Sequence, residues 1–311
     1  MSDRARSAPL AVRTAAAVIR RLPAGRHRAA MWVADRVRDP FWTKLPAPLG
    51  SLAFRCDLRD GLMRDAYLTG QYEPQETALV RDLVRPGMTF ADVGANWGYF
   101  TLVAAHLVGS RGRVICVEAD PRAVAAIRAN VQANQLTTVT IVEAAATDVP
   151  CELRFERYEP ARGNASGNYG VAQSANDSGG DDPVIVRGRP LDDIFDEAHV
   201  AHIDVLKMDI EGGEATALGG LARSLAADRI DHIVLELHPE ALANLGSSVA
   251  SVCRVLDNAG FDGWRIDHSI HSHRRAASAS VDVASLLSPL RAADDIGSWP
   301  HVLWRRRGLR R

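Results

Sequence analysis

The sequence lacks the features that mark disulfide-rich, secreted and membrane-spanning proteins. Its four cysteines are far apart and form no C-x-x-C pair: Cys56, Cys116, Cys151 and Cys253. No apolar run approaches the length of about 20 residues that crosses a bilayer, and the N-terminus has no continuous apolar stretch typical of a signal peptide. We therefore expect free thiols in a reducing compartment, and a cytoplasmic location.

A basic excess and a cluster of aromatic residues are also missing. The chain carries 37 Lys and Arg against 38 Asp and Glu, a net charge of −1. A general nucleic-acid binder normally has a strongly basic surface and aromatic platforms for the bases. The 311 residues, 47% of them hydrophobic, suffice for an ordinary globular protein with a large core. We expect no nucleic-acid partner.

The N-terminal part is rich in arginine and alanine and differs from the rest. Helical patterns over about 10–22 and 27–38 are separated by a Pro-Gly break, and a short strand pair is predicted at 50–57. We treat residues 1–69 as a basic helical extension. Such helices can make peripheral membrane contact or form the face of a homodimer, or they can simply be solvated on their basic side.

Residues 70–311 alternate short apolar strands with helical patterns. This order predicts an α/β domain with a mostly parallel sheet covered by helices on both faces. One helix is expected over 215–227. The segment 151–190 changes character: alternating strands at 152–158 and 184–189 predict an antiparallel, loop-rich insertion, either a substrate lid or a surface excursion.

The strongest local pattern lies early in this domain. An apolar strand, Thr89–Val93, is followed by a glycine-bearing turn, Gly94–Gly98, and then by a helix, Tyr99–Val108. A second strand, Arg113–Val117, ends at the acid Glu118. Together these elements form half of a nucleotide-binding βαβ unit. A carboxylate at the tip of the second strand can accept both hydroxyl protons of a ribose.

The spacing within the turn indicates which nucleotide is bound. Asn96 stands where a dinucleotide site needs its second glycine, so the pattern is D-x-G-x-x-x-G. That pattern favours S-adenosylmethionine, and Asp92 adds a negative charge near its cationic methionyl group; a purely structural βα turn is the alternative. The predicted cofactor-binding residues are Tyr72, Glu73, Asp92, Gly94, Ala95, Asn96, Gly98, Glu118, Ala119, Ala145 and Asp209.

Candidate catalytic residues follow the later strands, at the sheet edge where ligands of open α/β sheets bind. They are Asp209, His238, Lys207 and Glu211. Asp209 is the first candidate for accepting a proton from a hydroxyl nucleophile, and His238 can do the same near neutral pH. Lys207 shares a strand face with Asp209, which suits either an ion pair or a catalytic role.

Two groups of residues have the donor atoms of a metal site. Asp209, Glu236 and His238 could hold a divalent cation such as Mg²⁺. The run H-x-x-H-x-H, formed by His268, His271 and His273, is expected to be a solvent-exposed segment, because neither a cysteine nor a carboxylate completes a zinc site there.

Several strings together resemble the FkbM-type S-adenosylmethionine-dependent methyltransferases, over roughly residues 70–267. The strings are Phe90–Thr101, Val117–Pro121, Leu191–Asp193, Asp204–Glu214 and Leu235–Pro239. The resemblance implies a Rossmann-like sheet of seven strands with the last antiparallel, and O-methylation of a hydroxyl on a sugar, glycolipid or polyketide-type natural product. Two positions depart from the family pattern: Ala119 replaces a proline and Gly213 replaces an alanine.

Other functions fit parts of the same pattern. A methyltransferase for a carboxylate or amine would use the same cofactor but need no general base for a carboxylate. A non-catalytic cofactor-binding or scaffold protein would keep the turn, and replacing Asp209 or His238 by alanine would then leave the phenotype of the cell unchanged. An NAD-dependent oxidoreductase is contradicted by Asn96.

Overall fold

The structure is a computed structural model that describes residues 7–22, 25–157, 170–174, 184–277, 281–290 and 300–309. Its α-helices are α1 (Leu10–Ile19), α2 (Arg26–Ala34), α3 (Gly61–Arg64), α4 (Pro74–Leu83), α5 (Tyr99–Val108), α6 (Pro121–Ala133), α7 (Leu191–Glu197), α8 (Glu214–Gly219), α9 (Ala222–Ala226), α10 (Pro239–Asn244), α11 (Val249–Asn258) and α12 (Ile270–Ala276). Short 3-10 or π turns are η1 (Ala47–Leu49), η2 (Asp65–Thr69), η3 (Gly109–Arg111) and η4 (Val283–Leu286).

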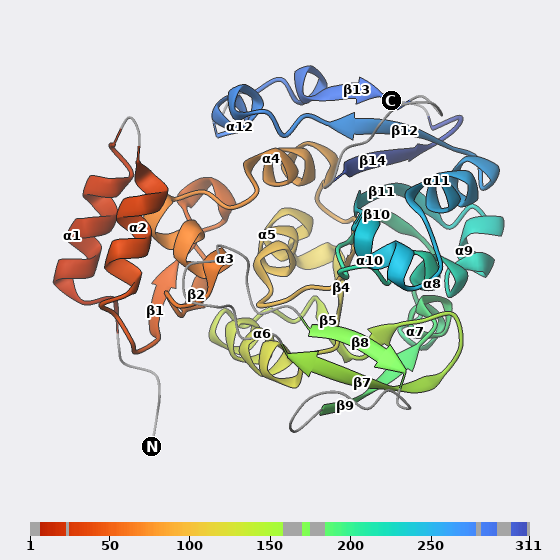
Figure 1. Ribbon diagram of the computed structural model, residues 1–311, viewed down its shortest axis with the longest axis horizontal. Coiled ribbons are helices and arrows are strands. Elements are labelled where there is room, and N and C mark those ends of the chain that lie inside the picture. The colour runs from red at the N-terminus through yellow and green to blue at the C-terminus, as the bar shows by residue number, and fades with distance from the viewer. Residues whose placement is uncertain are drawn as a thin grey trace.

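The strands are β1 (Phe41–Lys44), β2 (Ala53–Cys56), β3 (Thr89–Val93), β4 (Arg113–Glu118), β5 (Val139–Glu143), β6 (Ala145–Ala146), β7 (Cys151–Arg157), β8 (Gly170–Ser174), β9 (Val184–Arg189), β10 (Ile203–Met208), β11 (Ile230–Glu236), β12 (Phe261–Ile266), β13 (Leu287–Pro289) and β14 (His301–Arg306). A central sheet has the order β13-β12-β14-β11-β10-β3-β4-β5 (Figure 1). The run from β11 to β5 is parallel, whereas β14 is antiparallel to both of its neighbours.

This arrangement confirms the expected α/β fold with an antiparallel last strand, but the predicted count of seven strands is wrong. Among the described residues the central sheet has eight strands. The additional strand is β13, which pairs antiparallel with β12 at the sheet edge. It ends at Pro289, and a proline lacks the N–H that an inner strand would need, so this short segment suits an edge. The three residues of β13 are too few to form a periodic pattern from which a strand could be predicted.

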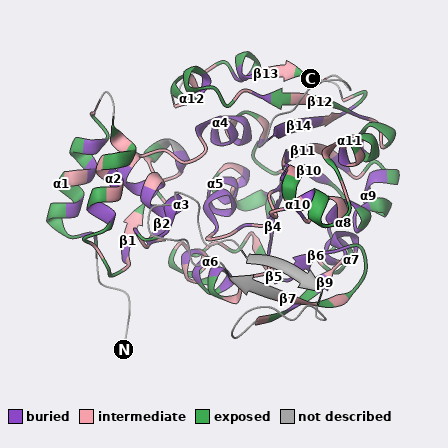
Figure 2. Cartoon of the chain, in the orientation of Figure 1, coloured by how far each residue is buried: buried purple, intermediate pink, exposed green. Residues whose placement is uncertain are grey.

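The two faces of the sheet bury separate clusters of side chains. Phe90 and Val114 pack with α4 and α5, whereas Ala91 and Ile115 pack with the cluster around α7 and α8. Successive residues of a strand point to opposite faces, so continuous apolar runs are needed where both faces are covered. Figure 2 shows the resulting buried centre beneath outer helices with exposed faces. The charged residues Asp92, Lys207 and Glu236 lie at or next to the carboxyl ends of inner strands.

The N-terminal extension packs onto the domain instead of standing apart. Val12 and Ala16 of α1 belong to the same buried cluster as Phe100 of α5. The side-chain amides of Asn130 and Asn134 bond the backbone of β2, which pairs with β1 in a separate two-stranded sheet. The strand pair expected over 50–57 thus uses an earlier first strand. No described helix is long and apolar enough to cross a membrane, and the dimer face and membrane contact stay predictions.

The helix expected over 215–227 is interrupted by a distant contact. It forms α8 and α9, and a Cβ on Gly220 between them would lie 2.1 Å from the backbone oxygen of Thr147. The backbone N–H groups of Arg223 and Ser224 donate to the carboxylate of Asp192, which caps the second helix. Contacts with Thr147 and Asp192, which flank the insertion, therefore fix where the helix breaks.

The segment after β5 contains the expected antiparallel strands. β7 pairs antiparallel with β8 and β9, and the four-stranded sheet has the order β6-β9-β7-β8. Most of the loop-rich stretch expected between the two alternating strands lies outside the described residues. The lid role of this insertion and the boundary at residue 69 stay predictions.

Candidate active site

A cavity of about 450 Å³ opens at the carboxyl ends of β3, β4, β10 and β11. Every predicted cofactor-binding residue except Gly98 lines it: Tyr72, Glu73, Asp92, Gly94, Ala95, Asn96, Glu118, Ala119, Ala145 and Asp209. Of the predicted catalytic residues, Lys207 and Glu211 line it as well, and His238 contacts Glu211. The volume is within the range of small-molecule sites.

The turn between β3 and α5 requires glycine at its first position. Gly94 has φ of +79°, and a Cβ there would lie 1.9 Å from the backbone oxygen of Asp209. The backbones at the ends of β3 and β10 can approach this closely only because the side chain is missing. Gly98 has φ of +84° and precedes α5, so it shapes the turn without lining the cavity.

Glu118 is held by backbone groups on both sides of its carboxylate. One oxygen accepts from the N–H of Asn96 and the other from the N–H of Asp120, each at 2.7 Å. A carboxylate has about four lone-pair positions, so acceptor capacity is left for a ligand. Burial raises the pKa of Glu118 to about 7. The group is oriented toward the cavity and is sensitive to pH near neutrality.

A buried ammonium group compensates the acids at the cavity floor. Lys207 Nζ lies 3.4 Å from Asp209 Oδ2 and 4.6 Å from the centroid of the Phe100 ring. Burial lowers the pKa of Lys207, but Asp209, Glu73 and Asp92 outweigh it and raise the value. Asp92 lies opposite Lys207 in the sheet and accepts a 2.6 Å bond from the Thr101 hydroxyl. Lys207 therefore stays charged.

His238 is clamped between carboxylates. Its Nδ1 lies 2.8 Å from Oε1 of the fully buried Glu214, and its Nε2 lies 3.2 Å from Glu211, 3.7 Å from Glu236 and 4.0 Å from Asp209. Burial lowers the pKa of His238, but the bond to Glu214 and the charges of Glu211 and Asp209 raise it on balance. Glu214 fixes the ring and was missed from the sequence, although it stands three residues after Glu211.

The acids around His238 have different proton affinities. Burial raises the pKa of Glu211 to about 7, and burial together with Asp209 and Glu73 raises the pKa of Glu236 to about 11. Burial would also raise the pKa of Asp209, but Lys207 and His238 outweigh it, so that this value is lowered. Near neutral pH, Glu236 is protonated, Asp209 is ionised and Glu211 can exchange a proton. Such separated values suit acid–base chemistry.

Glu211 also has an uncommon backbone conformation. Its φ is +55°, in the left-handed region that residues with a Cβ seldom adopt. The following residue, Gly212, has φ of +108° and donates its N–H to Glu214. This turn directs Glu211 to both the cavity and His238, and strain of this kind is often found at functional sites.

The three residues expected to hold Mg²⁺ are divided between two clusters that share Asp209. Donor atoms of Asp209, Glu211 and His238 lie within 4.8 Å of one another, as do those of Glu73, Asp209 and Glu236. The Lys207 ammonium at 3.4 Å from Asp209 already supplies a positive charge at this place. The cation therefore stays a prediction from the sequence.

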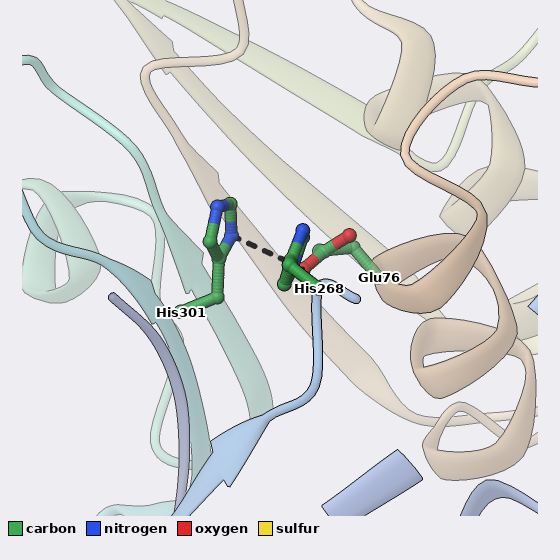
Figure 3. A group of neighbouring side chains, drawn as sticks. All are labelled: Glu76, His268 and His301. Carbon is green, nitrogen blue, oxygen red and sulfur yellow. Dashed lines mark hydrogen bonds and ion pairs between the residues drawn. The ribbon is translucent and has the colours of Figure 1, made fainter. Parts of the chain in front are cut away.

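The H-x-x-H-x-H run is exposed at all three histidines, as expected, but its first residue also contacts a buried carboxylate. His268 is about one-third exposed and lies 2.6 Å from a carboxylate oxygen of Glu76. His301 lies 3.1 Å from the same oxygen (Figure 3). His271 and His273 are exposed on α12. The carboxylate that the sequence pattern seemed to lack comes from α4, 192 residues away along the chain.

Comparison with known proteins gives both a family and individual relatives. Residues 92–262, more than half of the chain, match the family described as Methyltransferase FkbM domain. A probable cobalt-precorrin-6B C(15)-methyltransferase of Sulfolobus acidocaldarius is 41% identical over 70 residues, which are 22% of this chain and 36% of that protein. The 2-O-methyltransferase NoeI of Sinorhizobium fredii is 27% identical over 162 residues, 49% of this chain and 64% of that protein. The chain thus matches less than two thirds of either relative.

Similar solved structures include a putative rRNA-methylase from Clostridium thermocellum, with a TM-score of 0.43 and 13% identity over 74% of this chain and 93% of that one. Aeropyrum pernix fibrillarin in complex with S-adenosyl-L-methionine has a TM-score of 0.40 and 12% identity over 74% of this chain and 73% of that one. The fold described above stands on the strand order of the sheet itself.

Proposed function

The chain belongs to the methyltransferase FkbM family, and from this membership we propose that it is an S-adenosylmethionine-dependent O-methyltransferase. Its acceptor would be a hydroxyl group on a sugar, a glycolipid or a polyketide-type natural product. The match confirms the resemblance inferred from the sequence motifs. Oxygen as the receiving atom is favoured by the similarity to the 2-O-methyltransferase NoeI, whereas the relative that methylates a carbon matches over 70 residues only.

The cavity suits the proposed cofactor. Glu118 offers free lone pairs to the ribose hydroxyls, and the missing side chain at Gly94 lets the ends of β3 and β10 lie close together at the cavity. Asp209, whose pKa is lowered by Lys207 and His238, supplies negative charge near the expected sulfonium, and Asp92 lines the cavity beside it. When bound, S-adenosylmethionine would supply a methyl group on a positively charged sulfur, which is a good leaving group.

The chain must then remove a proton from the acceptor hydroxyl. Glu211 lines the cavity with a pKa of about 7, and His238 lies 3.2 Å behind it. Glu214 holds the far side of the imidazole, as the orienting acid does in other histidine-dependent sites. We assign proton acceptance to Glu211 and His238, with Lys207 and Asp209 as the neighbouring ion pair. The observation that carries this assignment is the row of contacts from Glu211 through His238 to Glu214.

An assay of S-adenosylhomocysteine release tests the proposal. The wild type is offered hydroxylated sugars, glycolipids and polyketides, with matched carboxylate and amine compounds. We expect turnover on a hydroxyl acceptor, and rates lower by roughly 10²–10⁴-fold in E211Q and H238N.

Two controls sharpen this assay. H202N removes a half-exposed histidine that pairs with Asp231, at the far end of the same strands, and should leave the rate unchanged. Cofactor binding by E211Q and H238N should also be kept. Turnover confined to carboxylates or amines, or full activity in both variants, would contradict the assignment.

A further inference from the structure

We propose that Glu76, His268 and His301 form a binding site for a divalent transition metal ion, next to the cavity but separate from it. Glu76 lies in the first turn of α4, His268 follows β12, and His301 is the first residue of β14 (Figure 3). The proposal does not depend on methyl transfer, because it rests on these three side chains alone.

The donor atoms already converge on one point. His268 Nε2 lies 2.6 Å and His301 Nδ1 lies 3.1 Å from Oε1 of Glu76, and one donor atom from each residue lies within 4.8 Å of the others. Ligands at about 2.1 Å from a tetrahedral ion are themselves about 3.4 Å apart. Small shifts of the side chains would therefore admit an ion. Two imidazoles and one carboxylate form a known three-ligand set that leaves a position open for water.

The carboxylate of Glu76 has unused binding capacity. The side chain is 2% exposed, and its second oxygen, Oε2, has no hydrogen-bond partner among the described residues. A buried polar atom without a partner is costly and rare in folded proteins. A bound ion would satisfy both carboxylate oxygens as well as the two rings, which stack with centroids 3.8 Å apart.

Neighbouring groups hold the two histidines in place. The other ring nitrogen of His301, Nε2, lies 3.5 Å from Glu236 Oε1, and metal-binding histidines commonly contact an outer carboxyl or carbonyl oxygen in this way. His268 follows Asp267, whose carboxylate accepts from the Ser269 N–H and the Ser272 hydroxyl. These bonds fix the turn that presents His268 to Glu76.

The site would join distant segments at the wall of the cavity. Glu73, which lines the cavity, precedes α4 and lies one helical turn before Glu76; Glu236, which lines it too, contacts His301. An ion would tie α4 to the start of β14 and the end of β12. The bound ion would thus hold this wall of the cavity in position. Imidazole ligands favour Zn²⁺ and its first-row neighbours over Mg²⁺, and we commit to Zn²⁺.

Metal titration of the full chain tests this site. The protein is freed of metal with a chelator and titrated with Zn²⁺ by calorimetry and with Co²⁺ by visible absorption, with Mg²⁺ for comparison. We expect uptake of one equivalent of Zn²⁺ that displaces Co²⁺. The dissociation constant should rise at least about 10-fold in H268N and in E76Q, since even outer-shell changes have this effect.

Matched variants separate this site from other histidines. H271N changes an exposed histidine of the same run, and H202N disrupts a surface group with Asp204 and Asp231; both should bind like the wild type. Circular dichroism of each metal-free variant checks folding, and H268N changes a partly exposed residue. The proposal is overturned by the lack of stoichiometric uptake, by unchanged affinity in folded H268N and E76Q, or by a loss that follows H202N or H238N instead.

Discussion

Replacing Gly94 by alanine should separate the ends of β3 and β10. A Cβ at this position would lie 1.9 Å from the backbone oxygen of Asp209, and real contacts of this kind are not shorter than 3.0 Å. The two strand ends must therefore move apart by roughly 1 Å, a displacement that can lower the activity of a site about 100-fold. The same movement shifts Asp209, which lines the cavity.

The cost to stability has two parts, which a second glycine distinguishes. Gly94 has φ of +79°, and an alanine in this region costs roughly 1–2 kcal/mol. Overpacking adds about 1–3 kcal/mol. Gly87 has φ of +89°, but a Cβ on it would have no neighbouring atom within 4 Å. G87A should thus show the backbone cost alone, and G94A about 2–5 kcal/mol in all.

Urea unfolding gives the free energies, and calorimetric titration with S-adenosylhomocysteine gives the affinities. We expect G87A to bind like the wild type and G94A to bind about 100-fold more weakly. Equal stability losses in the two variants, or wild-type affinity in G94A, would refute the reasoning from the close approach at Asp209.

Three further predictions follow from single side chains. The pKa of Glu118 is raised to about 7, and binding of a ribose needs the ionised form of this carboxyl group. Affinity for S-adenosylhomocysteine should therefore fall by up to about 10-fold per pH unit below pH 7. Titrations at several pH values should show that E118Q loses this dependence. The Glu214 bond helps raise the pKa of His238, so E214Q should move the acidic limb of the pH–rate profile to lower pH, and an unmoved limb would exclude this role. D192A removes the carboxylate that caps α9 and should destabilise the protein by about 2–4 kcal/mol in urea unfolding, whereas D193A, on an exposed side chain, should change little.

Local patterns predicted the part of the fold that carries the cofactor turn. β3 and α5 begin and end at the residues predicted for them, and the glycine spacing of the turn required the left-handed positions at Gly94 and Gly98. These features depend on neighbouring residues alone, so periodicity and turn chemistry are enough. The convergence of Asp92, Glu118 and Asp209 on one cavity likewise follows from the parallel order of their strands.

Contacts between distant residues could not be predicted in this way. The break at Gly220 depends on the backbone oxygen of Thr147, and the partner of His268 is 192 residues away in Glu76. Glu214 contacts His238 because the turn at Glu211 places the two side chains together, and this contact is not encoded in a local pattern. The contacts between such residues follow no fixed sequence spacing, because tertiary packing determines which side chains lie together.

The central claim is that the turn after β3, together with Glu118, binds the nucleoside of S-adenosylmethionine. Calorimetric titration of the full chain with S-adenosylhomocysteine and, separately, with NAD⁺ tests it most directly. The account predicts one equivalent of S-adenosylhomocysteine, at least about 10-fold weaker binding in E118A, and no uptake of NAD⁺. Failure of the wild type to bind S-adenosylhomocysteine, or binding of NAD⁺ in its place, would contradict it.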